Sequence, residues 1–546
     1  MDQPKPSDSE PGARPPGGRH PRALAPANLL LTLGLSVFGA IVGMQIMAAV
    51  GMTPATSIIG AVAAMALARI PLAQFAGFRS PHAQNLAQTS ISSATFGAAN
   101  SLFLPIGIPY LFGLPDLVLP MLVGVSLAML LDAWMLYRLF DTPVFPARNP
   151  WPLGIATAEA IKAGDAGGRQ ARLLLGGLAV GAAGAALAVP MSALGIALLG
   201  GLAAMVAFAV GLLVRAYSQA WFQVDIAALY IPHGVMIGAG LMALVQVSRL
   251  VLSPSRAPQP AGPASARTAG APGQRAGRTL RRGALAYGGL TLLLALGTGL
   301  HQDMAPGMLA LFVVYAAFSA FVHEIIVGIS AMHAGWFPAF AVALITLLLG
   351  ILLGLPASAL VVLAGFTAAT GPAFADMGYD LKTGYLLRGE GADPAFERDG
   401  RAQQAIAALL GFGVAIAVVA LSYPALFAAH QFAPINAAYV AAIKAGISSE
   451  TARTLALWAV PGALLQALGG SRRQLGVLLA TGLLIGGVWA GWMVALGLVA
   501  RLAARAWLGA GASARIEVFA GGVIAGDALY SFFHGSSMSI HQRGSK

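Results

Sequence analysis

Runs of about 20 apolar residues recur along this chain from Ala27 to near its C-terminus, and they restrict its fold more than any other feature. A helix of about 20 residues is long enough to cross the roughly 30 Å hydrocarbon core of a bilayer. The 546 residues are 58% hydrophobic and include only 32 Lys and Arg and 20 Asp and Glu, too few charges for a soluble protein of this length. We therefore predict an all-α polytopic membrane protein with about 14 to 16 transmembrane helices.

Glycine, proline, cysteine and net charge constrain the fold further. The 68 glycines allow helices to approach closely in lipid, and the 33 prolines predict broken or re-entrant segments. The chain has no cysteine, which excludes disulfides and thiolate metal sites. The net charge of +12 comes from Lys and Arg that flank the apolar runs, so it indicates membrane orientation and not nucleic-acid binding.

A basic segment divides the chain into two parts. It contains six arginines, five prolines and no acidic residue, which is typical of a flexible linker that stays on the cytoplasmic side. The polar, proline-rich N-terminus lacks the pattern of a signal peptide and is predicted to be a disordered cytoplasmic tail. The predicted organisation is a tail (1–26), a first transmembrane half (27–251), the linker (252–283), a second transmembrane half (284–537) and a C-terminal tail (538–546).

Short sequence repeats indicate that the two halves are related. Ala-Ile-Lys-Ala-Gly occurs at 160–164 and 442–446, and Gly-Val-x-x-Gly-x-x-Leu begins at Gly234 and at Gly522. Leu-x-Gly-Leu-Pro begins at Leu111 and at Leu352. Because the three pairs keep their order, they favour a duplicated unit, whose copies could be parallel or inverted. Internal repeats are typical of secondary transporters, which bind substrate where the repeats meet. No G-x-x-x-x-G-K-[ST] motif for ATP is present.

The first half carries amide side chains in an otherwise apolar setting. On a helix, Gln84, Gln88 and Ser92 share one face, and Asn85 lies beside them. Asn100 follows in the next apolar run. Such amides either line a polar pathway or join neighbouring helices by hydrogen bonds.

Two further groups of polar residues follow in the first half. Glu159 and Lys162 are spaced as a helical ion pair, which is either a surface feature or part of a site. Asp225 and His233 stand at the two ends of a short apolar stretch.

The second half contains ionisable residues at membrane depth, where they are costly and often functional. His323 and Glu324 lie in one apolar span, and Val327 rules out an H-E-x-x-H zinc motif. Asp376 lies near the end of a span predicted over 356–378, which Gly371 and Pro372 interrupt. The charges at and after Asp376 either form a substrate or ion site at the broken helix or belong to an interfacial loop. Asp527 is surrounded by glycines and serves either packing or proton transfer.

Several segments resemble the oligopeptide transporter superfamily, which includes the yellow-stripe-like metal-chelate transporters. The segment ADMGYDLKTGYLL (375–387) is similar to the family's D-(L/F)-K-T-G stretch, which assigns Asp380, Lys382 and Gly384 to that motif. PWPLGIATAEAIKAG (150–164), with Glu159 and Lys162, is similar to a second motif, although Leu153 departs from it. AQNLAQTSISSA (83–94) and GGVIAGDAL (521–529) resemble two more. The resemblance implies a bacterial member that drives uptake of short peptides, or of metals bound to peptide-like chelators, with protons.

Our leading hypothesis is a proton-coupled symporter of the bacterial inner membrane, without cofactor or metal site, whose partners are its substrate, a coupling proton and the lipid bilayer. Uptake of metal chelates and a channel are the alternatives. A membrane enzyme would need a catalytic constellation, which the scattered histidines do not provide. No His or Cys cluster suits a bare metal ion. A homodimer is compatible with the sequence. The predicted substrate-binding residues are Gln84, Asn85, Gln88, Asn100, Asp225, His233 and His323, and the predicted proton-coupling residues are Glu324, Asp376 and Asp527.

Overall fold

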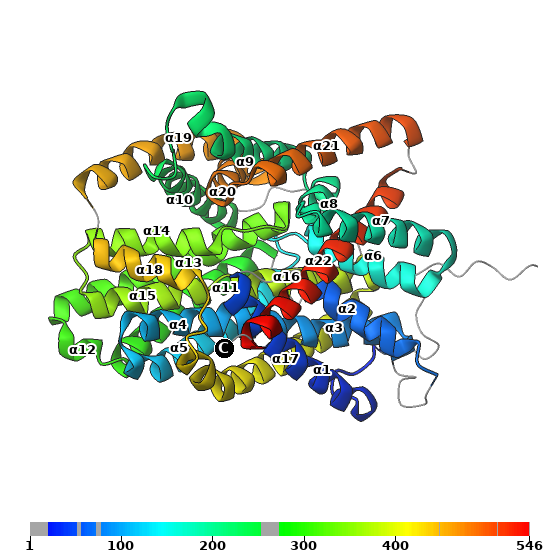
Figure 1. Ribbon diagram of the computed structural model, residues 1–546, viewed down its shortest axis with the longest axis horizontal. Coiled ribbons are helices and arrows are strands. Elements are labelled where there is room, and N and C mark those ends of the chain that lie inside the picture. Colours follow the sequence, from blue (N-terminus) through cyan, green and yellow to red (C-terminus); the bar gives the residue numbers. More distant parts are fainter. Residues whose placement is uncertain are drawn as a thin grey trace, which may run out of the picture.

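The computed structural model describes residues 20–51, 56–71, 78–252, 272–446, 448–509 and 512–544, and this part of the chain folds entirely from helices and their connections (Figure 1). Eleven helical segments among these residues are long and apolar enough to cross a membrane, and four apolar helices are shorter. The predicted class, an all-α polytopic membrane protein, is confirmed.

The helices of the N-terminal part are α1 (Pro26–Val50), α2 (Thr56–Ala68), α3 (Pro81–Phe96), the π-helical segment η2 (Gly97–Phe103), α4 (Leu104–Phe112), the 3-10 turn η3 (Pro115–Leu117), α5 (Val118–Leu139), α6 (Pro152–Ala166), α7 (Gly168–Ala186), α8 (Met191–Leu199), α9 (Leu202–Phe222) and α10 (Ile231–Leu252). Two helices, α11 (Pro272–Gly297) and α12 (Leu300–Asp303), connect this part to the next.

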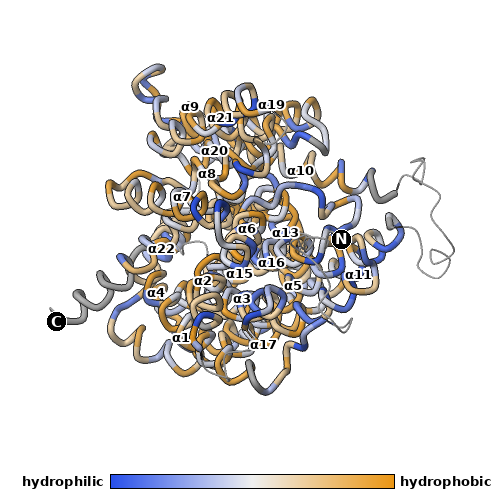
Figure 2. Tube along the Cα trace, turned by 90° about the vertical axis from the view of Figure 1, so that its right-hand side faces the viewer, coloured by the Kyte–Doolittle hydropathy of each residue, from blue (hydrophilic) through white to orange (hydrophobic). Residues whose placement is uncertain are grey.

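The C-terminal part contains α13 (Pro306–Ala334), α14 (Ala339–Leu352), α15 (Ala357–Ala369), α16 (Pro372–Leu387), α17 (Pro394–Ala428), α18 (Ile435–Ala445), α19 (Ser449–Arg473), α20 (Leu475–Ile485), α21 (Val488–Leu508) and α22 (Ala512–Gly544). The tube coloured by hydropathy is apolar over most of these helices, with hydrophilic residues concentrated at their ends and connections (Figure 2).

Helix packing agrees with the internal repeat inferred from the sequence. The repeated motifs align α6 with α18 and α10 with α22, so that α7 to α9 correspond to α19 to α21. The helix contacts agree with this correspondence. The pair α7–α22 corresponds to the pair α19–α10, and the pair α9–α20 corresponds to the pair α21–α8. The helices α11 and α12 lie between the two copies in the chain and have no counterpart in this alignment.

The eight helices α7–α10 and α19–α22 pack on one another through glycine. A Cβ atom at Gly177 of α7 would collide with the carbonyl oxygen of Phe519 on α22, and one at Gly238 of α10 would collide with that of Ala459 on α19. Only glycine allows these backbones to approach so closely, as in other membrane helix pairs. Five of these helices, α9, α10, α19, α20 and α21, lie along the upper edge of the molecule in Figure 1.

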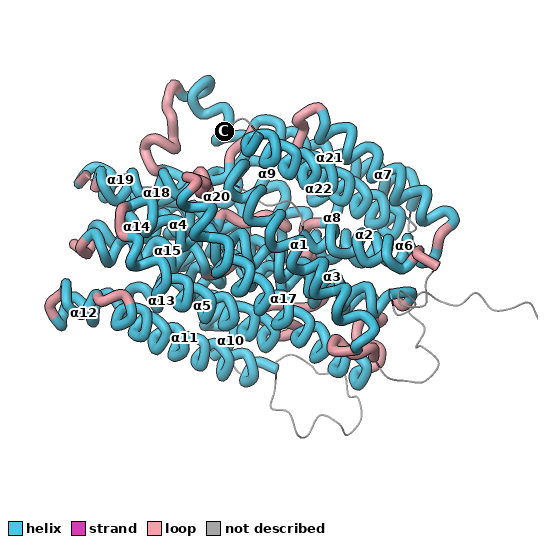
Figure 3. Tube along the Cα trace, turned by 60° about the horizontal axis from the view of Figure 1, so that its bottom comes forward, coloured by secondary structure: helices cyan, strands magenta, loops and turns pink. Residues whose placement is uncertain are grey.

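The other helices surround two spans that are buried far more than the rest. Residues buried inside the protein make up 94% of the most apolar window of Pro81–Phe112 and 89% of that of Ala357–Leu387. Both spans are irregular, the first through the π-helical turns of η2 and the second through a break at Thr370 and Gly371, where φ of Gly371 is 93°. Figure 3 shows α3, α4 and α15, which belong to these spans, among the neighbouring helices of the bundle. Irregular backbone at membrane depth is tolerated only where protein surrounds it.

The ends of the two predicted halves differ from expectation. Residues 20–25, expected in the disordered tail, lie against α3 and α17, with the His20 ring near His82 and Phe396. Burial lowers the pKa of His20 to about 4, so the docked ring is neutral at pH 7. Residues 1–19 and most of the linker lie outside the described residues.

Two predicted segment boundaries also move. The helix α11 begins at Pro272, so residues 272–283 are helical although their composition suggested a linker. Four arginines, which are good helix formers, and a proline at the first helical position are compatible with a helix that starts here. At the other end, α22 continues to Gly544 through part of the expected C-terminal tail.

Neighbouring glycines on α7 provide a test of this packing. Gly177→Ala should lower the melting temperature of the purified protein, because forcing extra atoms into a closed helix interface costs about 1–3 kcal/mol. Gly176→Ala is the matched control, since nothing lies within 4 Å of its Cβ position. A melting temperature that falls equally in both variants would contradict the proposed α7–α22 contact.

Candidate functional site

Two matching rows of polar side chains meet where α3 crosses α16. Gln88 and Ser92 lie one helical turn apart on α3, and Asp376 and Asp380 lie one turn apart on α16. The Ser92 hydroxyl donates to Asp376 Oδ1 at 2.7 Å, and the Gln88 amide donates to Asp380 Oδ1. All four side chains are buried. The predicted helical face of Gln88 and Ser92 is therefore present, and it faces the predicted carboxylate.

Hydroxyl and amide groups from two more helices complete this group. From α2, the Ser57 hydroxyl lies 3.4 Å from Asp380 Oδ1 and 3.1 Å from the Ser92 hydroxyl. From α17, the Gln404 amide donates to the carbonyl oxygen of Asp380 at 2.7 Å. We call this group the central polar cluster and define it as Thr56, Ser57, Gln88, Ser92, Asp376, Asp380 and Gln404.

The central polar cluster contains more acceptors than donors. Asp376 Oδ2, Asp380 Oδ2 and Gln88 Oε1 are buried without a hydrogen-bond partner among the described residues. No ion pair among the described residues includes Asp376 or Asp380. Buried acceptors without donors are costly in a low-dielectric medium. The cluster is therefore suited to bind a proton or a group that carries several N–H donors.

The helix that carries both aspartates extends further than predicted. The predicted span ended at residue 378, whereas α16 continues to Leu387, so Asp380, Lys382 and Gly384 are buried inside a helix and do not form an interfacial loop. The Lys382 ammonium donates to the carbonyl oxygen of Ala147 at 2.8 Å. A Cβ at Gly384 would collide with Gln404 and Arg388, which explains why glycine stands there.

A second buried polar group lies at the break between α15 and α16, and sequence analysis missed two of its members. Asp132 of α5 accepts from the Gly371 backbone N–H at 2.6 Å and from the Tyr287 hydroxyl of α11. Glu324 of α13 faces Asp132 and Tyr287. Asp132 is a lone acid within an apolar run, which is a signal for a functional or structural role.

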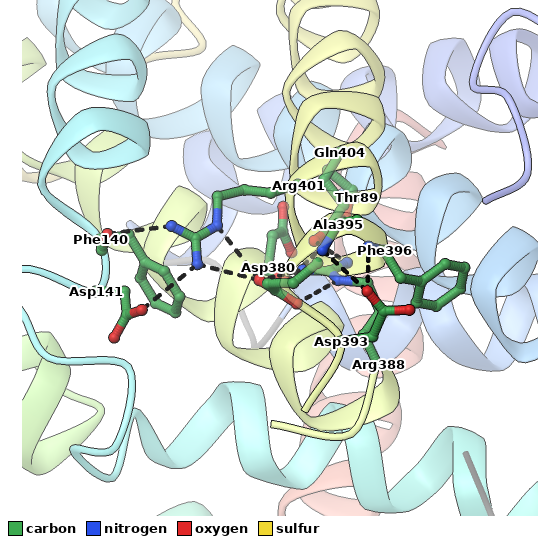
Figure 4. Close-up of polar contacts among 11 residues, drawn as sticks. Thr89, Phe140, Asp141, Asp380, Arg388, Asp393, Ala395, Phe396, Arg401 and Gln404 are labelled. Carbon is green, nitrogen blue, oxygen red and sulfur yellow. Dashed lines mark hydrogen bonds and ion pairs between the residues drawn. The ribbon is translucent and has the colours of Figure 1, made fainter. Parts of the chain in front are cut away.

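An ion-pair network joins the C-terminal end of α16 to the first turns of α17 (Figure 4). The Arg388 guanidinium donates to Glu397 at 2.7 and 3.1 Å and to Gln404 Oε1 at 2.7 Å. Burial lowers the pKa of Arg388, and Glu397 opposes this shift. Arg401 joins the network through Glu397 and the carbonyl oxygen of Phe140. Through Gln404, the network is bonded to the backbone of Asp380.

The remaining residues predicted on α3 and its extension lie close to the cluster in sequence but make other contacts. Gln84 donates to the carbonyl oxygen of Phe78 at 2.8 Å, near the start of the helix. Asn85 is fully buried, and its amide has no partner among the described residues. Asn100 lies in η2 and donates to the carbonyl oxygen of Phe96 at 3.3 Å.

Other predicted residues lie elsewhere. His323 bonds the Thr367 carbonyl at 2.7 Å, next to the break. Asp527 accepts from the backbone N–H of Ser192 and so caps the start of α8. His233 has its ring near Tyr230, where α10 begins.

Two pairs of charged residues complete the predicted set. Asp225 accepts from the N–H groups of the following turn, and a contact of 3.4 Å joins it to Arg215. The backbone N–H groups lower the pKa of this exposed carboxyl. Glu159 and Lys162 form an ion pair of 3.0 Å on α6. Neither pair contacts the central polar cluster.

A family model described as "OPT oligopeptide transporter protein" matches residues 24–242 and 181–535, which together cover nearly the whole chain. No curated protein matches the chain. The match confirms the resemblance drawn from the sequence motifs. Two of those motifs are in contact in the structure, since the Thr383 hydroxyl of α16 donates to the Gly154 carbonyl of α6 at 3.1 Å.

Two acids of α17 test the importance of the Arg388 network. Glu397→Gln leaves the buried Arg388 without its counter-ion, and loss of one partner of a buried ion pair costs about 3–5 kcal/mol. Asp399→Asn removes only the exposed pair with Arg22, which is worth about 0–1 kcal/mol. Thermal unfolding in detergent should therefore separate the two variants clearly. Equal melting temperatures would show that Arg388 does not depend on Glu397.

Proposed function

The chain belongs to the oligopeptide transporter family, and we propose that it is a proton-coupled symporter that imports short peptides across the bacterial inner membrane. Membership of the family implies a membrane transporter of oligopeptides or related compounds, not an enzyme. The peptide substrate, the proton and the direction of transport are our proposal.

The central polar cluster is the observation that supports this function best. It combines two carboxylates, a broken helix and unpaired acceptors inside the two most buried spans of the protein. Transporters commonly place substrate and coupling ion at discontinuous helices near the middle of the membrane. The two aspartates have no cationic partner among the residues that the structure describes, so a protonated amine, such as the N-terminal ammonium of a peptide, matches their chemistry.

The pair of carboxylates can hold a proton and a peptide ammonium at the same time. Asp376 and Asp380 lie one helical turn apart, and two negative charges so close in a low-dielectric interior repel each other. A single proton on one aspartate relieves this repulsion and leaves one negative charge. A peptide ammonium beside the other aspartate neutralises that remaining charge. The buried pair is therefore neutral only when proton and substrate are bound together, which would couple their movement in the same direction.

The arrangement of arginines supports a cytoplasmic N-terminus. Arg22, before α1, pairs with Asp399 near the start of α17, while Arg401 contacts the end of α5 and Arg388 follows α16. One end of the bundle therefore gathers arginines from several connections. By the positive-inside rule, this end faces the cytoplasm.

Uptake of metal chelates and passive passage through a channel are the alternatives to this function. The same transport experiments distinguish them from peptide symport. A chelate with free amino groups would satisfy the same carboxylates, so only direct comparison of substrates distinguishes it from a peptide. A channel needs a continuous open pathway, whereas the side chains of the central polar cluster are enclosed by protein on all sides.

Uptake into proteoliposomes tests the proposal. Tripeptides to pentapeptides should accumulate when the outside is acidic, and a protonophore should abolish this accumulation. Asp376→Asn and Asp380→Asn should each lower it by about tenfold or more, the effect of losing roughly 1.4 kcal/mol of interaction. Asp527→Asn is the control, because Asp527 caps α8 away from the cluster.

Three results would contradict the proposal. Accumulation that follows a sodium gradient and survives the protonophore would reject proton coupling. Uptake of metal–chelator complexes but not of peptides would reject the proposed substrate. Uptake that does not saturate, and that never exceeds the external concentration, would favour a channel.

A further inference from the structure

We infer that Asp132, Tyr287 and Glu324 form a second proton-binding site, separate from the Asp376–Asp380 pair and linked to it through the N-terminus of α16. The three side chains come from α5, α11 and α13, and all three are completely buried. Such a site would exist whatever solute the protein carries. Only its role in coupling depends on the proposed transport function.

Of the two acids, Asp132 has the surroundings that better stabilise a carboxylate. The Tyr287 hydroxyl donates to its Oδ1, and the Gly371 backbone N–H donates to its Oδ2 at 2.6 Å. Gly371 immediately precedes α16, so Asp132 also lies at the positive end of that helix dipole. Both oxygens thus accept hydrogen bonds, and hydrogen bonds of this kind favour the charged form of a carboxyl group.

Glu324 has the opposite surroundings. Neither of its carboxyl oxygens makes a well-formed hydrogen bond among the described residues. The ionisable groups that face it are Asp132 and Tyr287, neither of which is a cation. A second negative charge beside Asp132 would be unpaired in the membrane interior, which is costly. The geometry therefore assigns the exchangeable proton to Glu324, next to a carboxylate that stays ionised.

The neighbouring histidine does not supply a counter-charge. His323 Nδ1 lies 2.7 Å from the Thr367 carbonyl oxygen, which can only accept, so Nδ1 carries the hydrogen of that bond. Its other nitrogen has no partner among the described residues. A neutral ring satisfies the bond to Thr367, and this bond contributes to holding the end of α15 at the break.

The link between the two sites is a short piece of helix. Asp132 fixes the first N–H of the break at Gly371, while Asp376 and Asp380 follow on the first three turns of the same helix. When Glu324 loses its proton, repulsion from the new charge acts on Asp132, the group that holds Gly371. A shift of Asp132 would move the start of α16 and with it the two aspartates. Proton release at one site would thereby change binding at the other.

Infrared spectroscopy of the purified full-length protein tests the proton site without any substrate. The C=O stretch of a protonated carboxyl, measured as a difference between acid and alkaline samples, should lose one component in Glu324→Gln. Tyr287→Phe should shift that component, because the hydroxyl lies beside both acids. Ser330→Ala on the same helix is the control, since it removes only a contact with Thr481.

An unchanged spectrum in folded Glu324→Gln would overturn the inference, since no proton would then reside on Glu324. If that variant does not fold, as judged by size-exclusion chromatography and circular dichroism, Tyr287→Phe decides instead: a shifted component supports the site, and an unchanged one overturns it.

Transport provides the test of coupling. In Glu324→Gln, exchange of labelled for unlabelled substrate across the membrane should continue, while accumulation driven by a proton gradient should fall about tenfold or more. Normal accumulation in this variant would overturn the coupling role. If the unmodified protein transports no peptide at all, the proposed function fails, and the infrared result still decides whether the proton site exists.

Discussion

A helix that is broken inside a membrane leaves backbone groups that water cannot satisfy, and the structure depends on how the break between α15 and α16 is resolved. Asp132 accepts the Gly371 N–H, and His323 donates to the Thr367 carbonyl. These two side chains come from α5 and α13 and bind backbone groups on either side of the break. With the break held, α16 can begin in the middle of the protein and present Asp376 and Asp380 to α3.

The internal repeat gives this arrangement its surroundings. Eight helices, α7–α10 and α19–α22, pair across the two halves through close glycine contacts. Other helices enclose Pro81–Phe112 and Ala357–Leu387, the two spans that carry four of the seven residues of the central polar cluster. The helix α11 has no counterpart in the repeat, and it supplies Tyr287 to the second polar group. The helix that breaks the symmetry of the two halves therefore contributes to the group of Asp132 and Glu324.

Sequence patterns identified the parts of the site but not their partners. The helical face of Gln88 and Ser92 and the carboxylate Asp376 were predicted, because polar residues stand out in apolar runs. Their contact joins residues 284 positions apart, and local periodicity carries no information at that distance. Asp132, a lone acid in an apolar run, was not among the predicted site residues. Asp527 was among them, and in the structure it accepts from the backbone N–H of Ser192. An isolated acid looks the same in sequence whether it binds a proton or caps a helix.

The central claim is that the central polar cluster is the substrate site and is closed in this structure. The absence of cysteine in this chain allows one direct test of this claim. Ser57→Cys would introduce a single thiol beside Asp380, where the native side chain is only 1% exposed. In membranes with a proton gradient, a water-soluble thiol reagent should label this cysteine as the protein cycles, and a transported peptide should slow the labelling. A cysteine that stays unlabelled throughout transport, or is labelled at a rate that substrate does not change, would contradict the account.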